Sequence, residues 1–223
     1  MPQEIGLFEA MATMRAMRRL KPDPVPEALI WRIIEAGIKA PSGGNRQPWH
    51  FVVVREPAAK RFIQERYHAA FQRYMDAGMQ AMAEGKLVMA AEEIEQRLGT
   101  ARVALHLAEH LAEVPILLFA CIDRTASIEV AGTAGEISGV YASIYPAVQN
   151  ILLACRGLGL GAVLTTLHLL YEEEIKAHLG IPASVHLSAM IPIGYPKGRF
   201  GPVTRRPPEE VTHWDRWGAH RRP

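Results

Sequence analysis

The chain has 223 residues, of which 49% are hydrophobic and 22% charged, and its formal net charge is +2. These values are ordinary for a globular protein with a sizeable core, and the small charge argues against a nucleic-acid-binding surface. The 2 cysteines lie in apolar runs, which argues against a disulfide scaffold and predicts a reducing, cytoplasmic compartment.

Near the N-terminus, the pattern predicts two helices separated by a proline-rich break. Residues 7–20 mix apolar and basic side chains and are expected to form a helix that ends in a basic turn. Residues 21–26 cannot continue that helix, because prolines at 22, 24 and 26 interrupt it. Apolar residues then recur at helical spacing to about residue 39, so a second helix with one buried face is expected.

The loop at residues 40–49 reads Ala-Pro-Ser-Gly-Gly-Asn-Arg-Gln-Pro-Trp and is rich in polar groups. Gly43 and Gly44 let backbone N–H groups approach a ligand closely, and Asn45 and Gln47 each offer a side-chain donor and acceptor. Such a loop suits the polar edge of a flat heterocycle. An ordinary helix-to-strand connection with turn residues has the same composition, so both interpretations stay open on composition alone.

Further along the chain, strands alternate unevenly with helices, which favours an α+β fold with a mixed sheet surrounded by helices. Strands are predicted at 50–54, 114–122, 162–166 and 185–194, and helices at 143–156 and 171–179. Residues 57–113 are expected to be mostly helical and to hold a lid or an insertion. From residue 195 the chain is predicted to be an extended tail. The apolar runs are too short to span a membrane, and residues 1–223 are expected to form a single domain.

Other motifs give little support to different chemistry. Residues 106–110 match H-x-x-E-H, but no third ligand is apparent nearby, so no metal site is expected. Glycines at 157–161 follow a helix and precede a strand, which reverses the order that a dinucleotide fingerprint requires. No nucleophile elbow or P-loop occurs. The arginines at 15–19 and 205–206 are either solvated surface groups or two halves of one phosphate site.

Three landmarks follow one another along nearly the whole chain. The first is Met-Arg-Ala-Met-Arg-Arg-Leu at 14–20, with the prolines after it, and the second and most specific is the loop at 40–49. The third combines a Gly-Leu-Gly strand from 159, Pro-Ile-Gly-Tyr-Pro at 192–196 and the arginines at 205–206. Together they resemble the R-R-S-x-R, A-P-S-x-x-N-x-Q-P-W and P-x-G-Y-P signatures of the FMN-dependent nitroreductase-like flavoproteins.

This resemblance implies an FMN site assembled from distant parts of the chain. The implied cofactor-binding residues are Arg15, Ala16, Met17, Arg18, Pro41, Ser42, Gly43, Asn45, Gln47, Leu164, Thr165, Thr166 and Arg205. Arg15 and Arg205 would hold the phosphate, and Arg18 would stabilise negative charge near flavin N1 and O2. The backbone of residues 41–43 would line the ring, and residues 164–166 would lie near its other face or N5.

Two residues depart from the family pattern. Met14 stands where the family has its first arginine, and Ala16 stands where it usually has serine. One positive charge and one hydroxyl contact are therefore missing, which bears on how tightly FMN is held. Arg19 or Arg206 could share the role of the missing groups.

The resemblance also implies a homodimer with two shared sites, in which the tail and its Trp214 and Trp217 meet the partner. The implied function is an oxidoreductase in which NADH or NADPH delivers hydride to FMN and a small acceptor, such as a nitroaromatic or a quinone, then takes the electrons in a ping-pong cycle. Dehalogenation or flavin fragmentation by the same family is an alternative. A non-catalytic flavin-binding protein and a cofactor-free interaction protein are others.

Overall fold

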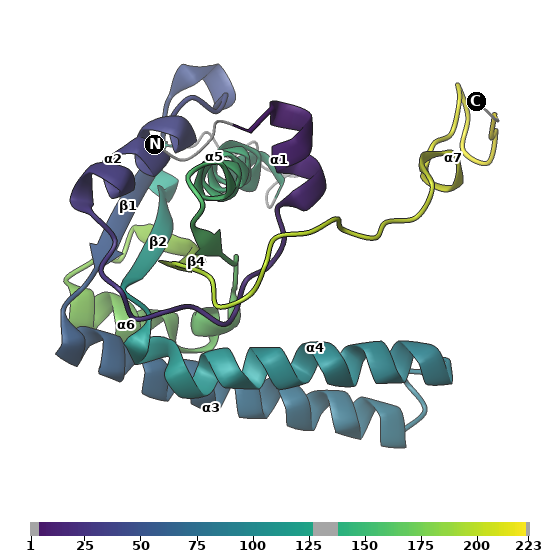
Figure 1. Cartoon of the computed structure of the whole chain (residues 1–223), viewed down its shortest axis with the longest axis horizontal. Coiled ribbons are helices and arrows are strands. Elements are labelled where there is room, and N and C mark those ends of the chain that lie inside the picture. Colours follow the sequence, from purple (N-terminus) through teal and green to yellow (C-terminus); the bar gives the residue numbers. More distant parts are fainter. Residues whose placement is uncertain (1–4, 127–137, 222–223) are drawn as a thin grey trace.

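The computed structural model describes residues 5–126 and 138–221. Its helices are α1 (Leu7–Thr13), α2 (Glu27–Gly37), α3 (Pro57–Ala83), α4 (Ala91–His110), α5 (Ser138–Gly157), α6 (Glu172–Leu179) and α7 (Pro208–Val211). Its strands are β1 (Trp49–Val54), β2 (Ile116–Asp123), β3 (Gly161–Ala162) and β4 (Val185–Gly194). Helices α1, α2 and α5 cover one face of the sheet, and α3, α4 and α6 cover the other (Figure 1).

The sheet has the strand order β1-β2-β4-β3, and every described pair of strands is antiparallel. The α+β fold with a sheet surrounded by helices is confirmed, and the pairs among the described strands are antiparallel. The reason lies in the connections. Between β1 and β2 the chain passes through the paired helices α3 and α4, which return it to the end of the sheet where β1 finished, and an antiparallel neighbour follows.

Strand β2 is the centre of the core, because both of its faces are buried. Leu118 and Ile122 pack with α2 and α5, whereas Leu117 and Phe119 pack with α3 and α4. All four side chains are fully buried. The continuous apolar run in the sequence therefore reflects burial on both faces, as predicted.

The segment at residues 14–21 lies along the edge of the sheet in a non-helical conformation. The Met17 N–H donates to Ala162 O at 2.9 Å, Lys21 N–H donates to Tyr195 O at 2.7 Å, and Leu20 bridges to Pro196. The predicted helix over 7–20 is therefore wrong beyond Thr13. Its buried residues Met17 and Leu20 are three positions apart, a spacing that also suits a helix, so the pattern could not separate the two conformations.

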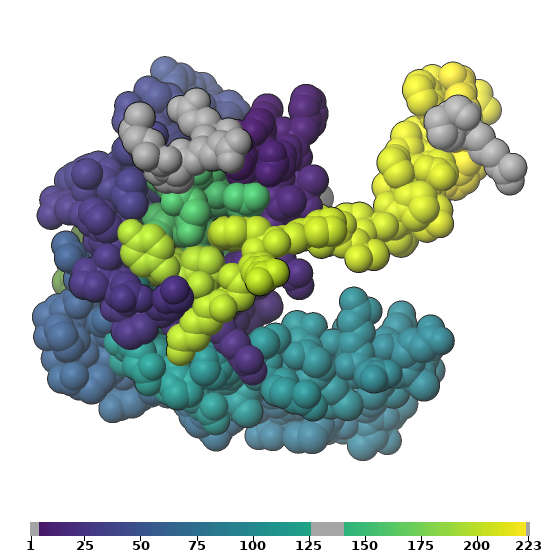
Figure 2. Space-filling view, viewed as in Figure 1, coloured from purple at the N-terminus to yellow at the C-terminus, as the bar shows by residue number. Residues whose placement is uncertain are grey.

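Two parts of the chain project from the body. Helices α3 and α4 form a long hairpin, which confirms the helical prediction for residues 57–113 (Figure 1). Residues 199–221, the C-terminal arm, extend away from the sheet and leave Trp217 90% exposed (Figure 2). Val203 N–H ties the start of this arm to Ala12 O at 3.1 Å. Within the described ranges, no helix combines the length and the apolar character that a bilayer crossing requires.

A substitution at Gly161 tests the packing of the edge segment. A Cβ there would lie 2.8 Å from Leu20 Cδ2 and 3.0 Å from Met17 Cβ. We expect Gly161→Ala to lower the free energy of unfolding by about 1–3 kcal/mol through overpacking. The control is Gly78→Ala in α3, where nothing lies within 4 Å, and which should raise it by about 1 kcal/mol through helix propensity. Urea denaturation measures both, and a neutral Gly161→Ala would contradict this packing.

Candidate functional site

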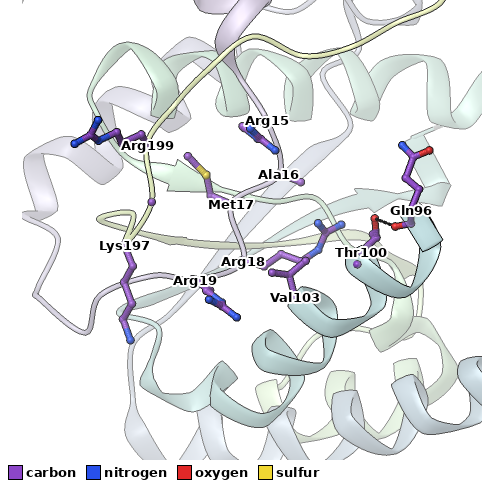
Figure 3. Close-up of a pocket in the computed structure, with 12 residues that line it drawn as sticks. Arg15, Ala16, Met17, Arg18, Arg19, Gln96, Thr100, Val103, Lys197 and Arg199 are labelled. Carbon is purple, nitrogen blue, oxygen red and sulfur yellow. Dashed lines mark hydrogen bonds between the residues drawn. The ribbon is translucent and has the colours of Figure 1, made fainter. Parts of the chain in front are cut away.

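A cavity of about 620 Å³ opens beside the edge segment, between residues 15–19, helix α4 and residues 197–199 (Figure 3). Its lining residues are Arg15, Ala16, Met17, Arg18, Arg19, Gln96, Gly99, Thr100, Val103, Lys197, Gly198 and Arg199. This volume falls within the range of about 300–1,000 Å³ that small-molecule and cofactor sites have. The cavity is therefore large enough for part of an organic cofactor or a substrate.

The lining of this cavity is strongly positive. Arg15, Arg18, Arg19, Lys197 and Arg199 contribute cationic groups, and none of the lining residues is acidic. Elsewhere in the described chain arginines do find acidic partners, as Arg66 does with Glu174 at 3.0 Å. No ion pair among the described residues involves the five lining cations. Guanidinium groups without an acidic partner suit a phosphate or another anion.

Tyr67 links the cavity to the segment that follows β3. Its hydroxyl lies 2.9 Å from Thr165 Oγ1, and its pKa is raised by burial, while the Thr165 hydrogen bond and the charge of Arg18 act in the opposite direction. Thr165 is also held by reciprocal backbone hydrogen bonds with Met190, at 2.9 and 3.0 Å. The buried phenol therefore fixes residues 164–166 close to the arginine segment.

The glycine-rich loop lies at a different place, between α2 and β1, where residues 43–47 are exposed. Its backbone is left-handed at Gly44 (φ 58°), Asn45 (φ 53°) and Gln47 (φ 53°). Ser143 of α5 holds the loop by accepting the Gly43 N–H at 3.1 Å. Left-handed conformations at residues other than glycine cost about 1–3 kcal/mol and gather at ligand-binding sites, so this shape favours a binding role over an ordinary connection.

The predicted site residues thus fall into two groups in one chain. Arg15, Ala16, Met17 and Arg18 line the cavity. Leu164, Thr165 and Thr166 do not, although Thr165 contacts Tyr67, whose pKa responds to the charge of Arg18. The second group, which is not part of the cavity lining, comprises Pro41, Ser42, Gly43, Asn45, Gln47 and Arg205. Arg205 is an exposed residue of the C-terminal arm. The loop therefore needs another surface, outside this chain's cavity, to take part in the same site.

Several cavity residues were not identified from the sequence. Gln96, Thr100 and Val103 come from α4, where no local motif marks them. Lys197 did have a signal, because it directly follows the Pro-Ile-Gly-Tyr-Pro run that ends β4. Residues after a strand end at a sheet edge are common binding groups, so this position could have been found.

His168 lies two residues after the 164–166 segment and is fully buried, with its ring edge-on to Phe119 at 5.5 Å between centroids. Neither ring nitrogen has a hydrogen-bond partner in the described structure. Burial lowers the pKa of His168 to about 4, and the nearby Leu187 backbone offsets only part of this effect. The native protein therefore holds a neutral imidazole at pH values where an unfolded chain would be protonated.

His168 should make stability depend on pH. Between its unfolded pKa of about 6.5 and the native value, only the unfolded state takes up the proton, so stability falls as pH falls. We expect proton uptake by His168 in the unfolded state to lower the free energy of unfolding by about 2 kcal/mol between pH 7.5 and pH 5. Urea denaturation at both pH values should show a correspondingly smaller loss in His168→Leu. The same loss in both proteins would show that His168 is not held neutral.

The chain is similar to known proteins over most of its length. The model described as the nitroreductase family matches residues 12–195. The chain is 31% identical over 207 residues to a Thermus thermophilus protein named NADH dehydrogenase, covering 90% of this chain and 91% of that protein. It is 28% identical over 203 residues to iodotyrosine deiodinase 1 of Rattus norvegicus, covering 89% of this chain and 65% of that protein.

Among solved structures, the fold is similar to that of a nitroreductase with bound FMN from Desulfitobacterium hafniense DCB-2. The TM-score is 0.66 at 19% sequence identity, and the match covers 94% of this chain and 98% of that one. This likeness shows that the helices and the sheet are arranged as in that protein.

Proposed function

Because this chain belongs to the nitroreductase family, we propose that it is an FMN-dependent oxidoreductase that passes electrons from NADH or NADPH to a small organic acceptor. The observation that carries this proposal is the cavity beside the edge segment, where Arg15 and Arg18 stand without an acidic partner among the described residues. The relatives named NADH dehydrogenase and nitroreductase support the same activity. When bound, FMN supplies the redox chemistry, since it accepts a hydride and releases electrons to an acceptor.

The residues present fit this cofactor. The FMN phosphate carries a charge of about −1.5 to −2, which the arginines of the edge segment can balance. Arg15 lines the cavity, and the arm that carries Arg205 starts beside Ala12 through the Val203 hydrogen bond. We assign the phosphate to Arg15 and Arg205.

Arg18 supplies the electrostatic part of the reaction. Its positive charge stabilises the negative charge that a flavin gains on reduction, because a fixed charge costs no reorganisation during the reaction. The buried Tyr67 holds Thr165, one of the residues that we assign to the flavin site, through the hydrogen bond between their hydroxyl groups. With this arrangement, no acid–base triad in the protein is needed, and the donor and the acceptor visit the same place in turn.

A second copy of the chain completes each site. The loop at 41–47 projects polar groups and left-handed backbone into solvent, although a family-type flavin site requires it beside the ring. A homodimer in which the loop of one copy meets the cavity of the other resolves this mismatch. The exposed Trp217 of the arm, at 90%, gains a partner surface in the same assembly. The free, buried Cys121 and Cys155 fit the cytoplasmic location expected from the sequence.

Reductive dehalogenation is the second candidate function. The relative named iodotyrosine deiodinase 1 aligns over 89% of this chain, which supports a halogenated acceptor within the same reaction scheme. Both candidates use the same cofactor and the same arginines, so they differ only in the acceptor.

The absorption spectrum of the purified protein tests the proposed function. We expect the bands of oxidised flavin, which NADH or NADPH bleaches without oxygen. A nitroaromatic or a quinone should then restore them if the protein is a reductase, and a halogenated phenol should restore them if it is a dehalogenase. A colourless protein that takes up no added FMN would contradict both candidates, and bound flavin that neither donor bleaches would indicate a non-catalytic binding protein.

A further inference from the structure

The cavity holds more positive charge than one flavin phosphate requires. Arg15 and Arg18 are assigned to FMN, which leaves Arg19, Lys197 and Arg199 in the same lining without an acidic partner among the described residues. Placing like charges together without a counterion costs free energy, because they repel one another. The three remaining cations therefore indicate a second anion.

Arg19 and Lys197 are held next to each other by the backbone. The Lys197 N–H donates to Arg19 O at 3.0 Å, and the neighbouring residues Leu20 and Pro196 form a β-bridge. Figure 3 shows the Arg18 side chain extending toward Thr100 and Val103 of α4, whereas the Arg19 and Lys197 side chains extend in a different direction from that of Arg18. One anion can therefore meet Arg18 while a different one meets the Arg19–Lys197 pair.

His106 of α4 lies within the electrostatic field of this pair. It lies one turn beyond Val103 and is partly buried, and its pKa is lowered first by burial and then by the positive fields of His110, Arg19 and Lys197. Glu109 acts in the opposite direction on this pKa but is the smallest of the causes. The field at His106 is therefore positive.

The other acid close to this group is already engaged. Glu113 accepts from His110 Nδ1 at 2.8 Å, and this hydrogen bond is the main reason that the pKa of Glu113 is low. Lys197 influences Glu113 only through its field, and no ion pair joins the two within the described residues. The Arg19–Lys197 pair thus keeps its capacity for an external anion.

We propose that Arg19 and Lys197 form a second anion-binding subsite, which holds a phosphate or carboxylate group of the ligand that exchanges electrons with the flavin. The subsite follows from the described side chains, and its role in catalysis rests on the proposed function. Charged donors bind such groups about tenfold or more tightly than neutral ones do, because a charge-assisted hydrogen bond is roughly twice as strong as a neutral one. The second ligand of this protein is thus an anion, such as a dinucleotide phosphate or an acidic acceptor.

Binding of inorganic pyrophosphate to the full chain saturated with FMN tests the subsite. Calorimetry should detect pyrophosphate bound to the FMN-loaded protein, and Lys197→Gln and Arg19→Gln should each weaken it about tenfold. The matched control is Arg97→Gln, an exposed arginine of α4 that does not line the cavity, and it should bind as the wild type does. Equal melting temperatures verify that the variants are folded.

Two results would overturn the subsite. One is loss of pyrophosphate binding by the wild type once FMN is saturating, because the flavin phosphate would then occupy the single anion site. The other is unchanged pyrophosphate binding in both variants. If the wild type takes up no FMN but binds pyrophosphate, and Lys197→Gln weakens that binding, the proposed function is disproved and the subsite is supported. The two failures are therefore distinguishable.

Matched pairs of ligands identify the source of the anion. A higher dissociation constant of Lys197→Gln for NADPH, but not for NADH, in anaerobic flavin reduction would assign the subsite to the 2′-phosphate of the donor. A higher constant for 4-nitrobenzoate, but not for neutral 4-nitrobenzamide, in reoxidation would assign it to an acidic acceptor. Equal losses with NADH and NADPH point to the shared pyrophosphate, and no loss with any charged ligand contradicts the proposal.

Discussion

The hydrogen bond from Met17 N–H to Ala162 O, at 2.9 Å, represents the constraint on which the site depends. It holds an extended segment against the sheet edge, where a Cβ at Gly161 would collide with Leu20. Burial of Met17 and Leu20 anchors the segment, so its arginines are turned toward the cavity and α4 rather than spread along a helix. The same edge receives residues 195–197 after β4, and in this way residues 15–19 and 197–199, which are far apart in the sequence, supply one positive cavity.

The position of the edge segment also divides the proposed site between two separate surfaces of the chain. The edge segment lies beside β3 and β4, whereas the 41–47 loop enters β1 at the far edge of the sheet and is held by Ser143 of α5. Because the order β1-β2-β4-β3 places these edges apart, one chain presents the cavity cations and the left-handed loop as separate surfaces. The flavin site that we propose therefore belongs to a pair of chains. In this proposal, dimer formation and cofactor binding are parts of the same event.

Much of this fold could be predicted from the sequence where the signal is local. The apolar run at 185–194 predicted β4 with its observed bounds, and Gly180 predicted the left-handed end of α6, with φ 67°. The loop at 40–49 was recognisable because its residue types are specific. Strand direction and the edge segment were not predicted, because both depend on pairing with distant residues. Lys197 joins Arg19 only through the tertiary fold, and α4 carries no motif for its place in the cavity.

Co-expression of two differently tagged variants, Arg15→Glu and Gly43→Trp, tests the divided site most directly. A Cβ at Gly43 would make an ordinary contact with its own chain, 3.9 Å from Ser143 Oγ, and we expect tryptophan at this position to block a ring beside the loop. Each variant alone should bind no FMN. A purified mixed dimer has one intact pair of cavity and loop, so about one FMN per two chains is expected. A mixed dimer without flavin would contradict the account, because a site built within one chain leaves both copies defective.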